Sequence, residues 1–430
     1  MMSERTGSPG DAAPDPGRRR AVLKERAEDF VVEEIPAYEP TGQGEHLYLL
    51  IEKRNATTSG VARALAREFD APLRAVGYAG LKDRHAITRQ WFSVHDPHRA
   101  IDESAVVRLD REWMRVLEAD RHGNKLRRGH LKGNRFRITA RGVGMAAAPA
   151  ALAALRGMES AGVANFFGHQ RFGARGSNHL IGRAIILAEL QEAVDRLLGL
   201  TEPGDDARVD APARRLYEER RYAEALVAFA SSAVPERRAL AALRRGGKAR
   251  DALRAVGPIQ RGFWLSAFQS AVFNDALRGR VRSGRLDQLE VGDIAFKHDC
   301  GAVFEVTAGD LGLALDARLS ALQISPSGPL WGPAMKCASG RPGDEERAAL
   351  DRSGVTMEDL ARAGRVWKER GLGSRRAMRV GVVSPTVEAG ADEHGEFVRC
   401  DFSLPPGAYA TVVMDRVFST ADALVAGGRW

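Results

Sequence analysis

The sequence has few cysteines and no long apolar run. Of its 430 residues only three are cysteines, Cys300, Cys337 and Cys400, and no two of them form a CxxC pair. This spacing excludes a disulfide framework and argues against a zinc ribbon. The most apolar stretch, Met145 to Leu155, is about half the length of a membrane-spanning helix, and Pro149 interrupts it. We therefore expect neither structural disulfides nor a membrane span.

The signatures of several large enzyme classes are also missing. The sequence has no GxxxxGK[ST] loop, no GxGxxG at the start of a helix, no HExxH and no GxSxG. Its ten histidines show no spacing typical of metal ligands. The N-terminal segment lacks the apolar core of a secretory signal. We therefore expect a cytoplasmic protein that uses no metal and no cofactor.

Positive charge is what the sequence has in excess. The 64 Lys and Arg residues outnumber the 56 Asp and Glu residues, which gives a net charge of +8 and a pI near 9.6. Nucleic acid is the usual partner of a basic protein. However, only nine of the basic residues are lysines, and a composition heavy in Arg and Ala can reflect genomic base composition alone. The charge by itself therefore leaves the partner open.

Composition changes along the chain and predicts its domains, of which the length suggests two or three. Residues 1–20 are rich in Gly, Pro and charge, as in a disordered arm. Residues 21–161 favour strands, 162–370 have the Ala, Leu, Arg and Glu content and periodicity of helices, and 371–430 return to a strand pattern. We predict a mixed α/β domain that is interrupted by a helical insertion.

Several elements can be placed by their periodicity. Alternation predicts strands at His46–Ile51, Asn134–Thr139 and Val398–Leu404. A helix is expected from Thr58, with that residue as the N-cap, and another near Tyr409.

The segment from Gly80 to Gln90 concentrates charged side chains in a loop between two short predicted strands. Asp83 lies between Lys82 and Arg84, and nearby cations favour an ionised carboxylate. Such a carboxylate can act as a nucleophile or a base. Considered alone, these residues fit better with a charged β-turn whose Asp accepts hydrogen bonds from backbone N–H groups.

A second unusual segment runs from Asn165 to Gly173. Three phenylalanines alternate there with Asn, His, Gln and Arg side chains. Aromatic faces can stack on bases, while Arg and amide groups bind phosphates and base edges. The same residues could form a turn that buries its rings in a core, and the segment alone favours neither interpretation.

Seven segments match, in the same order, the motifs of one known family. They are Lys24 with Glu28–Glu34, Gly42–Leu47, Gly80–Gln90, Lys132–Phe136, Asn165–Gly173, Phe263–Asn274 and Gly407–Thr411. Together they resemble the TruD family of tRNA pseudouridine synthases over most of the chain. The sequence departs from the usual motifs at Ala27, where Pro is common, at Phe166, where Tyr is frequent, and at Tyr409, where Phe is frequent.

The resemblance implies roles for individual residues. Asp83 is expected to be the catalytic carboxylate, with Lys24 as the cation that keeps it charged. Phe136 is expected to stack on the target base. The other residues that we expect to contact the substrate are Phe30, Gln90, Asn134, Asn165, Arg171 and Tyr409.

The resemblance also implies a fold and a reaction. The fold is a pseudouridine synthase core of the α+β type, with a mixed or antiparallel sheet, interrupted by a mainly helical TRUD insertion domain. The reaction converts a tRNA uridine, by resemblance position 13 in the D-arm, to pseudouridine without a cofactor. We expect a monomer whose partner is tRNA. Residues 191–255 look longer than in a typical bacterial member, and their role is open.

Two alternatives from other classes remain. One is a non-catalytic RNA-binding or RNA-folding protein. The other is an unrelated carboxylate-dependent enzyme that acts on a small anionic substrate. Whether Asp83 attacks the sugar, attacks the base or removes a sugar proton is not decided by the sequence.

Overall fold

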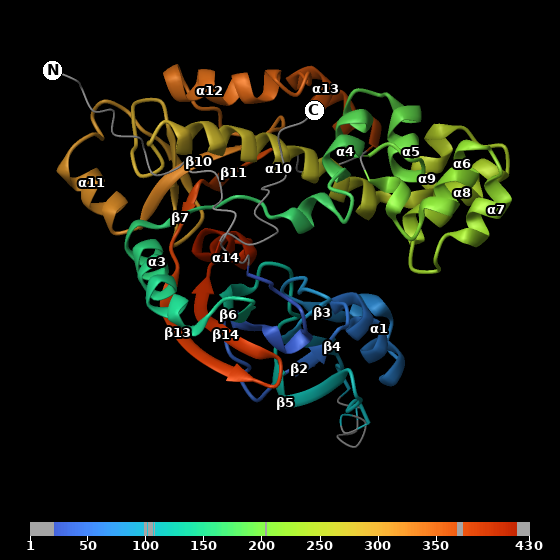
Figure 1. The fold of residues 1–430 in the computed structure, drawn as a ribbon, viewed down its shortest axis with the longest axis horizontal. Coiled ribbons are helices and arrows are strands. Elements are labelled where there is room, and N and C mark those ends of the chain that lie inside the picture. The colour runs from blue at the N-terminus through green and yellow to red at the C-terminus, as the bar shows by residue number, and fades with distance from the viewer. Residues whose placement is uncertain are drawn as a thin grey trace. The chain divides into compact units, whose positions relative to one another are not determined.

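The chain divides into two compact units in a computed structural model (Figure 1). The structure describes residues 21–98, 101, 106, 108–202, 204–367 and 373–418. Of these, 21–160 and 381–418 form the first unit, and 161–380 form the second. The predicted disordered arm, residues 1–20, lies outside the described residues. The second unit is thus an insertion in the first.

A mixed sheet of eight strands forms the first unit, as the sequence predicts. The strand order is β13-β14-β6-β1-β4-β2-β5, with β3 paired to β4. Only the β1–β4 pair is parallel among the described strands of this sheet. The strands are β1 (Phe30–Pro36), β2 (His46–Arg54), β3 (Val76–Tyr78), β4 (Ile87–His95), β5 (Met114–His122), β6 (Leu131–Arg141), β13 (Val383–Asp392) and β14 (Gly395–Leu404).

The described helices of the first unit precede, connect or follow these strands along the chain. They are η1 (Ala27–Asp29), α1 (Thr58–Glu68), η2 (Leu73–Ala75), η3 (Met145–Ala147), α3 (Ala148–Ala161) and α14 (Ala410–Phe418). The buried face of α1 carries Val61 and Leu65, which belong to one apolar cluster with Leu49, Ile51 and Phe92 of the sheet. The strand and helix periodicities in this part of the sequence therefore meet in a single core.

The start of α1 differs by one residue from the prediction. Thr57, not Thr58, is the N-cap, and its hydroxyl accepts a hydrogen bond from the Gly60 N–H. The Thr58 hydroxyl is buried and donates instead to Gln90 Oε1 at 3.0 Å. It also accepts from the Lys82 N–H at 3.0 Å. Of the two adjacent threonines, Thr57 thus caps the helix and Thr58 bonds Gln90 and the Lys82 backbone.

The alternation predicted for β6 is confirmed. Phe136 and Ile138 are buried, whereas Arg135 and Arg137 are exposed on the other side of the strand. The next strand continues the pattern, since Phe402 of β14 pairs in register with Phe136. One face of the sheet is therefore aromatic and the other is charged.

The second unit is mainly helical, as predicted. Its helices are η4 (His169–Phe172), α4 (Asn178–Ile186), α5 (Leu190–Leu198), η5 (Asp205–Ala207), α6 (Ala211–Glu218), α7 (Tyr222–Ala228), α8 (Val234–Arg244), α9 (Ala249–Val256), α10 (Pro258–Arg282), α11 (Leu313–Ser320), α12 (Gly340–Asp351) and α13 (Met357–Trp367). Helices α5 to α9 comprise most of residues 191–255 and gather beside α4 (Figure 1).

Helices α4 and α10 approach each other very closely. A Cβ on Gly182 would lie 2.1 Å from the carbonyl oxygen of Trp264, so only glycine fits there. Both helices contribute to a large apolar core that also includes α5, α8 and α9. Within the described part of the chain, no helix is both long and apolar enough to cross a membrane.

The second unit also contains strands, which its helical composition does not predict. They are β7 (Val163–Ala164), β8 (Ile294–Lys297), β9 (Val303–Glu305), β10 (Ile324–Leu330), β11 (Ser374–Ala377) and β12 (Arg379–Val380). They form a four-stranded sheet in the order β11-β10-β8-β9 and a β12-β7 pair. Strand β10 contains Pro326, Gly328 and Pro329, which usually argue against a strand. Residues 373–380, which composition assigned to the last domain segment, belong here because β11 and β12 pair with β10 and β7.

Candidate active site

The structure brings Lys24 and Asp83 together. Lys24 Nζ lies 3.3 Å from Asp83 Oδ2, although 59 residues separate them in sequence. Their side chains are 17% and 25% exposed, so the pair is shielded but reachable from solvent. Lys24 has a φ of 61°, a left-handed backbone that costs a non-glycine residue about 1–2 kcal/mol. Such strain is typical of functional sites.

Aromatic rings lie beside this pair. Lys24 Nζ is 3.9 Å from the centroid of the Phe30 ring, a cation–π contact. The Phe30 centroid is 6.2 Å from that of Phe136, which is 5.9 Å from that of Phe402. The three rings form a row across β1, β6 and β14. Phe136 is 7% exposed and so offers little free surface.

Lys82 is next to Asp83 in sequence, but its ammonium group contacts Glu34 and Asn134. Its ammonium group lies 2.6 Å from Glu34 Oε2 and donates to Asn134 Oδ1 at 2.6 Å. Glu34 and Asn134 are paired in register across β1 and β6, and this pairing creates the position that Lys82 fills. The contact with Glu34 is an ion pair between two buried side chains. Burial lowers the pKa of Lys82 and raises the pKa of Glu34, while their mutual attraction opposes both shifts.

The bond from Lys82 fixes the orientation of the Asn134 amide. Because Oδ1 accepts from Lys82, the amide NH₂ faces away from the ammonium group. The NH₂ group is therefore the end of the Asn134 amide that can donate to another group.

Lys53 is a second buried cation at the site, and we did not predict it. It is 0% exposed and donates to two carbonyl oxygens, those of Ala56 and Asp83, both at 2.7 Å. Burial lowers the pKa of Lys53 to about 8, although the nearby Asp83 carboxylate raises it. The sequence contains a pattern that predicts the burial of Lys53, because this residue continues the alternation of Leu49 and Ile51 on the buried face of β2.

Gln90 forms hydrogen bonds that hold the loop preceding Asp83. It is buried, its Nε2 donates to the Gly80 carbonyl at 3.1 Å, and its Oε1 accepts from Thr58. That Gln90 contacts the substrate stays a prediction; in this structure each end of its amide bonds a group inside the protein. Its role in this structure is to position the loop.

The predicted contacts Asn165 and Arg171 lie in the second unit and bind other groups of that unit. Asn165 is buried, donates to the Ala377 carbonyl at 2.8 Å and accepts from Arg376 at 2.6 Å. Arg171 donates to Ser270 Oγ at 3.0 Å, and its guanidinium group is 5.1 Å from the centroid of the Phe263 ring. For Asn165 the substrate contact stays a prediction, and in this structure these bonds use both ends of its amide.

Two predicted motifs of the second unit contact each other. The Phe167 N–H donates to Asn274 Oδ1 at 2.9 Å, and Asn274 Nδ2 donates to the Phe167 carbonyl at 3.0 Å. The segments Asn165–Gly173 and Phe263–Asn274 are thus parts of one hydrogen-bonded cluster.

Tyr409 lies immediately before α14 and is half-buried. Leu404, at the end of β14, pairs with Asn134 in register, so the turn to Tyr409 begins beside that residue. Tyr409 therefore remains a candidate for substrate contact.

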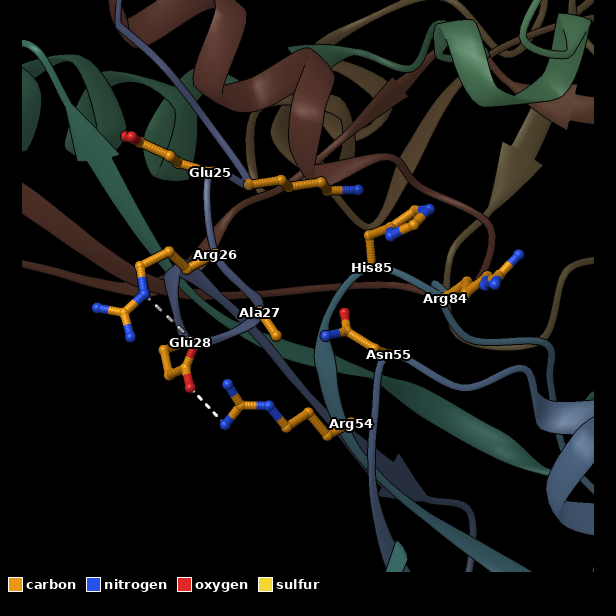
Figure 2. A pocket seen from close by; sticks show the side chains of 9 residues that line it. Glu25, Arg26, Ala27, Glu28, Arg54, Asn55, Arg84 and His85 are labelled. Carbon is orange, nitrogen blue, oxygen red and sulfur yellow. Dashed lines mark ion pairs between the residues drawn. The ribbon is translucent and has the colours of Figure 1, made fainter. Parts of the chain in front are cut away.

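A hollow of about 510 Å³ opens beside Lys24 (Figure 2). It is lined by Lys24, Glu25, Arg26, Ala27, Glu28, Arg54, Asn55, Arg84 and His85. In the described ranges no three His, Cys, Asp or Glu side chains gather as metal ligands would. The chemistry that this arrangement offers is that of a carboxylate and a cation next to aromatic rings.

Comparisons with known proteins agree on one family. A family model described as tRNA pseudouridine synthase D (TruD) matches residues 16–417. The chain is 42% identical over 403 residues to the tRNA pseudouridine synthase D of Geotalea daltonii, covering 93% of this chain and 96% of the relative. It is 36% identical over 409 residues to that of Anaeromyxobacter dehalogenans, covering 94% of each. A crystal structure from Methanosarcina mazei, described as a tRNA pseudouridine synthase D (TruD), matches with a TM-score of 0.72 and 27% identity over 94% of both chains. The chain belongs to the TruD family of tRNA pseudouridine synthases.

Proposed function

We propose that this protein converts a uridine of tRNA to pseudouridine, by family resemblance the uridine at position 13 of the D-arm, and that it acts as a cytoplasmic monomer. The observation that carries the proposal is the Lys24–Asp83 pair, with 3.3 Å between Nζ and Oδ2, in which the lysine lines a hollow. The family membership supports an isomerase that acts on RNA. The first unit is proposed to be the catalytic domain and the second unit the insertion domain.

The proposed reaction needs a uridine that has left its helix. A base within folded RNA is inaccessible, so it is flipped outward before the chemistry. The bond between N1 and C1′ then breaks, the uracil turns, and a bond forms between C5 and C1′. The proton on C5 is lost to solvent and N1 gains one, so the product is an isomer of the substrate.

Asp83 supplies the reactive group in this proposal. Attack on the sugar, attack on the base and removal of a sugar proton all require an ionised carboxylate. The Lys24 ammonium group balances that charge at 3.3 Å. Lys53 holds the backbone of the same residue through its carbonyl, so the carboxylate is presented from an anchored loop.

The neighbouring residues would hold the base. Phe136 and Phe30 lie side by side, and an uracil would contact them through the small part of Phe136 that is exposed. Asn134 offers its amide N–H to an acceptor of the nucleotide, because Lys82 occupies its oxygen. The base would thus be held by an apolar contact and a directed hydrogen bond.

Tritium release from tRNA labelled at C5 of uridine tests the proposal. Wild-type protein is expected to release tritium, and Asp83→Asn is expected to bind the tRNA without release. A non-catalytic RNA-binding protein would bind in both forms and release nothing.

A further inference from the structure

The hollow beside Lys24 has an uneven distribution of charge that the proposed chemistry does not use. Its lining holds four cations and two carboxylates, which leaves a surplus of two positive charges. These are Lys24, Arg26, Arg54 and Arg84 against Glu25 and Glu28.

At one end of the hollow each cation has a carboxylate partner, and the two arginines share Glu28. Arg54 Nη1 lies 2.5 Å from Glu28 Oε1, and Arg26 Nε lies 3.9 Å from Oε2 of the same carboxylate. Figure 2 shows Glu28 between these two arginines. Lys24 is likewise paired with Asp83. An anion that bound these groups would first have to displace a carboxylate.

At the other end two basic side chains stand free. Arg84 and His85 are exposed and form no ion pair or side-chain hydrogen bond with any other residue of the described ranges. In Figure 2 both point away from Glu28. They follow Asp83 directly in the chain, so their backbone is only one and two residues from the proposed catalytic carboxylate.

A second hollow on the charged face of the same sheet differs from the first in the pairing of its arginines. It is lined by Val31, Glu33, Arg89, Arg135, Arg137 and Asp401. There Arg135 and Arg137 lie 2.8 and 3.3 Å from Asp401, and Arg89 Nε lies 2.8 Å from Glu52 Oε2. Both hollows are rich in arginine, but in the second one these arginines are all paired. The two hollows therefore differ in the ion pairing of their arginines and not in their arginine content.

We propose that Arg84 and His85 bind a backbone phosphate of the RNA strand that carries the target uridine. This inference rests on the proposed function. A nucleotide whose base reaches Asp83 carries phosphates on both sides of its own sugar, so a phosphate must lie close to the reacting carbon. Arg forms charge-assisted, two-pronged hydrogen bonds with phosphate, and an imidazole N–H can add a third donor. Binding there releases counterions from the RNA and breaks no ion pair inside the protein.

Salt dependence of tRNA binding provides the first test. All variants are made in the Asp83→Asn protein, so that the uridine stays unconverted during equilibrium measurements. Arg84→Gln is expected to weaken binding about fivefold. It should also reduce the slope of log K against log salt by about 0.7–0.9, the value for one phosphate contact. Arg137→Gln is the matched control, an exposed arginine that is already paired with Asp401, and it should change neither quantity.

A chemical substitution in the RNA provides the sharper test. One of the two phosphates next to the target uridine is replaced by a neutral methylphosphonate. The reference RNA carries the same 2′-deoxyribose at that linkage with an ordinary phosphate. At one of the two positions the parent and Arg137→Gln proteins should lose about fivefold in affinity, whereas Arg84→Gln and His85→Gln should lose less than about twofold. If all four proteins respond equally at both positions, the phosphate site is wrong.

Failure of this site and failure of the proposed function can be distinguished. If wild-type protein releases no tritium from labelled tRNA but the methylphosphonate effect depends on Arg84, the activity is wrong and the phosphate site stands. If tritium is released and the effect does not depend on Arg84 or His85, the activity stands and the site is wrong.

Discussion

The family motifs in the two units differ in how they use several of their polar side chains. In the first unit, Asp83 keeps a carboxylate within reach of solvent, and Asn134 keeps an amide N–H directed away from its lysine partner. In the second unit, Asn165 and Asn274 use both ends of their amides on groups of that unit. A polar motif can therefore indicate a reactive site or an internal brace, and hydrogen bonding distinguishes the two.

The difference has a physical basis. A side chain that binds or attacks a substrate must keep a donor, an acceptor or a lone pair available for it. A side chain that braces the fold is buried, and burial is costly unless all its polar groups are bonded. The following predictions use this contrast, beginning with the largest expected effect.

Replacing Asp83 by Asn should abolish turnover and leave the fold intact. The amide has the shape of the carboxylate but cannot ionise. We expect the single-turnover rate to fall at least about a thousandfold, or about 4 kcal/mol in the barrier. Tritium release measures the rate and a binding assay measures retained affinity for tRNA. Activity within tenfold of wild type would exclude Asp83 as the reactive group.

Phe136 combines both roles, because it is buried between Phe30 and Phe402 and is proposed to contact the base. Phe136→Ala should reduce the free energy of unfolding by about 3–5 kcal/mol through the cavity that it leaves. It should also lower the single-turnover rate at saturating tRNA, since stacking contributes ~1–3 kcal/mol per base.

Phe136→Tyr separates the two contributions. It keeps the ring, so the rate should change little if contact with the base is the role of Phe136. Urea unfolding and single-turnover kinetics are measured on the same samples. A Tyr variant that folds normally but is as slow as the Ala variant would leave packing as the only role of the ring.

How far the sequence predicts the fold depends on the element. Alternation predicts β2, β6 and β14 because each has one buried face, and the start of α14 follows from the end of β14. Strand β10 is missed because two prolines and a glycine hide its pattern, although its neighbours supply the pairing. Local propensity therefore fails where tertiary pairing decides the structure.

The site is less predictable than the fold, because its contacts cross the sheet. From the residues alone, Lys82 and Arg84 are the cations expected to keep Asp83 ionised, because they are its neighbours in sequence. Only the family resemblance predicts Lys24 in this role. The structure shows why, since the register of β1 and β6 places Glu34 and Asn134 where they capture Lys82. Spacing along the chain contains no information about this pairing.

Asn134 and Asn165 form a matched pair that tests the contrast between the units. Asn165→Ala should reduce the free energy of unfolding by about 1–3 kcal/mol, because it leaves the Ala377 carbonyl and Arg376 without a partner. Its single-turnover rate in folded protein should stay close to wild type. Asn134→Ala should show the reverse, with a clear loss of rate and a smaller loss of stability. Equal loss of rate in both variants would mean that Asn165 also contacts the substrate.

Lys53 gives the smallest and most specific prediction, a dependence of stability on pH. Its pKa in the folded protein is about 8, against an ordinary value of 10.5, so between these values the unfolded chain binds a proton that the folded protein does not. The contribution of Lys53 to stability should therefore rise with pH above about 8, by at most about 1.4 kcal/mol per pH unit. Below pH 8 the buried ammonium group is charged in both states and the contribution should be constant.

Urea unfolding of wild type and Lys53→Met from pH 7 to 9.5 tests this prediction. The difference in stability between the two proteins should grow with pH in favour of wild type. The lost bonds to Ala56 and Asp83 add a term that is independent of pH, since a neutral amine still donates. Lys132→Met, at an exposed lysine of the same unit, controls for the loss of a lysine without the loss of a buried one. If the difference between wild type and Lys53→Met stays constant over this range, Lys53 keeps its proton and its carbonyl partners stabilise the ammonium form.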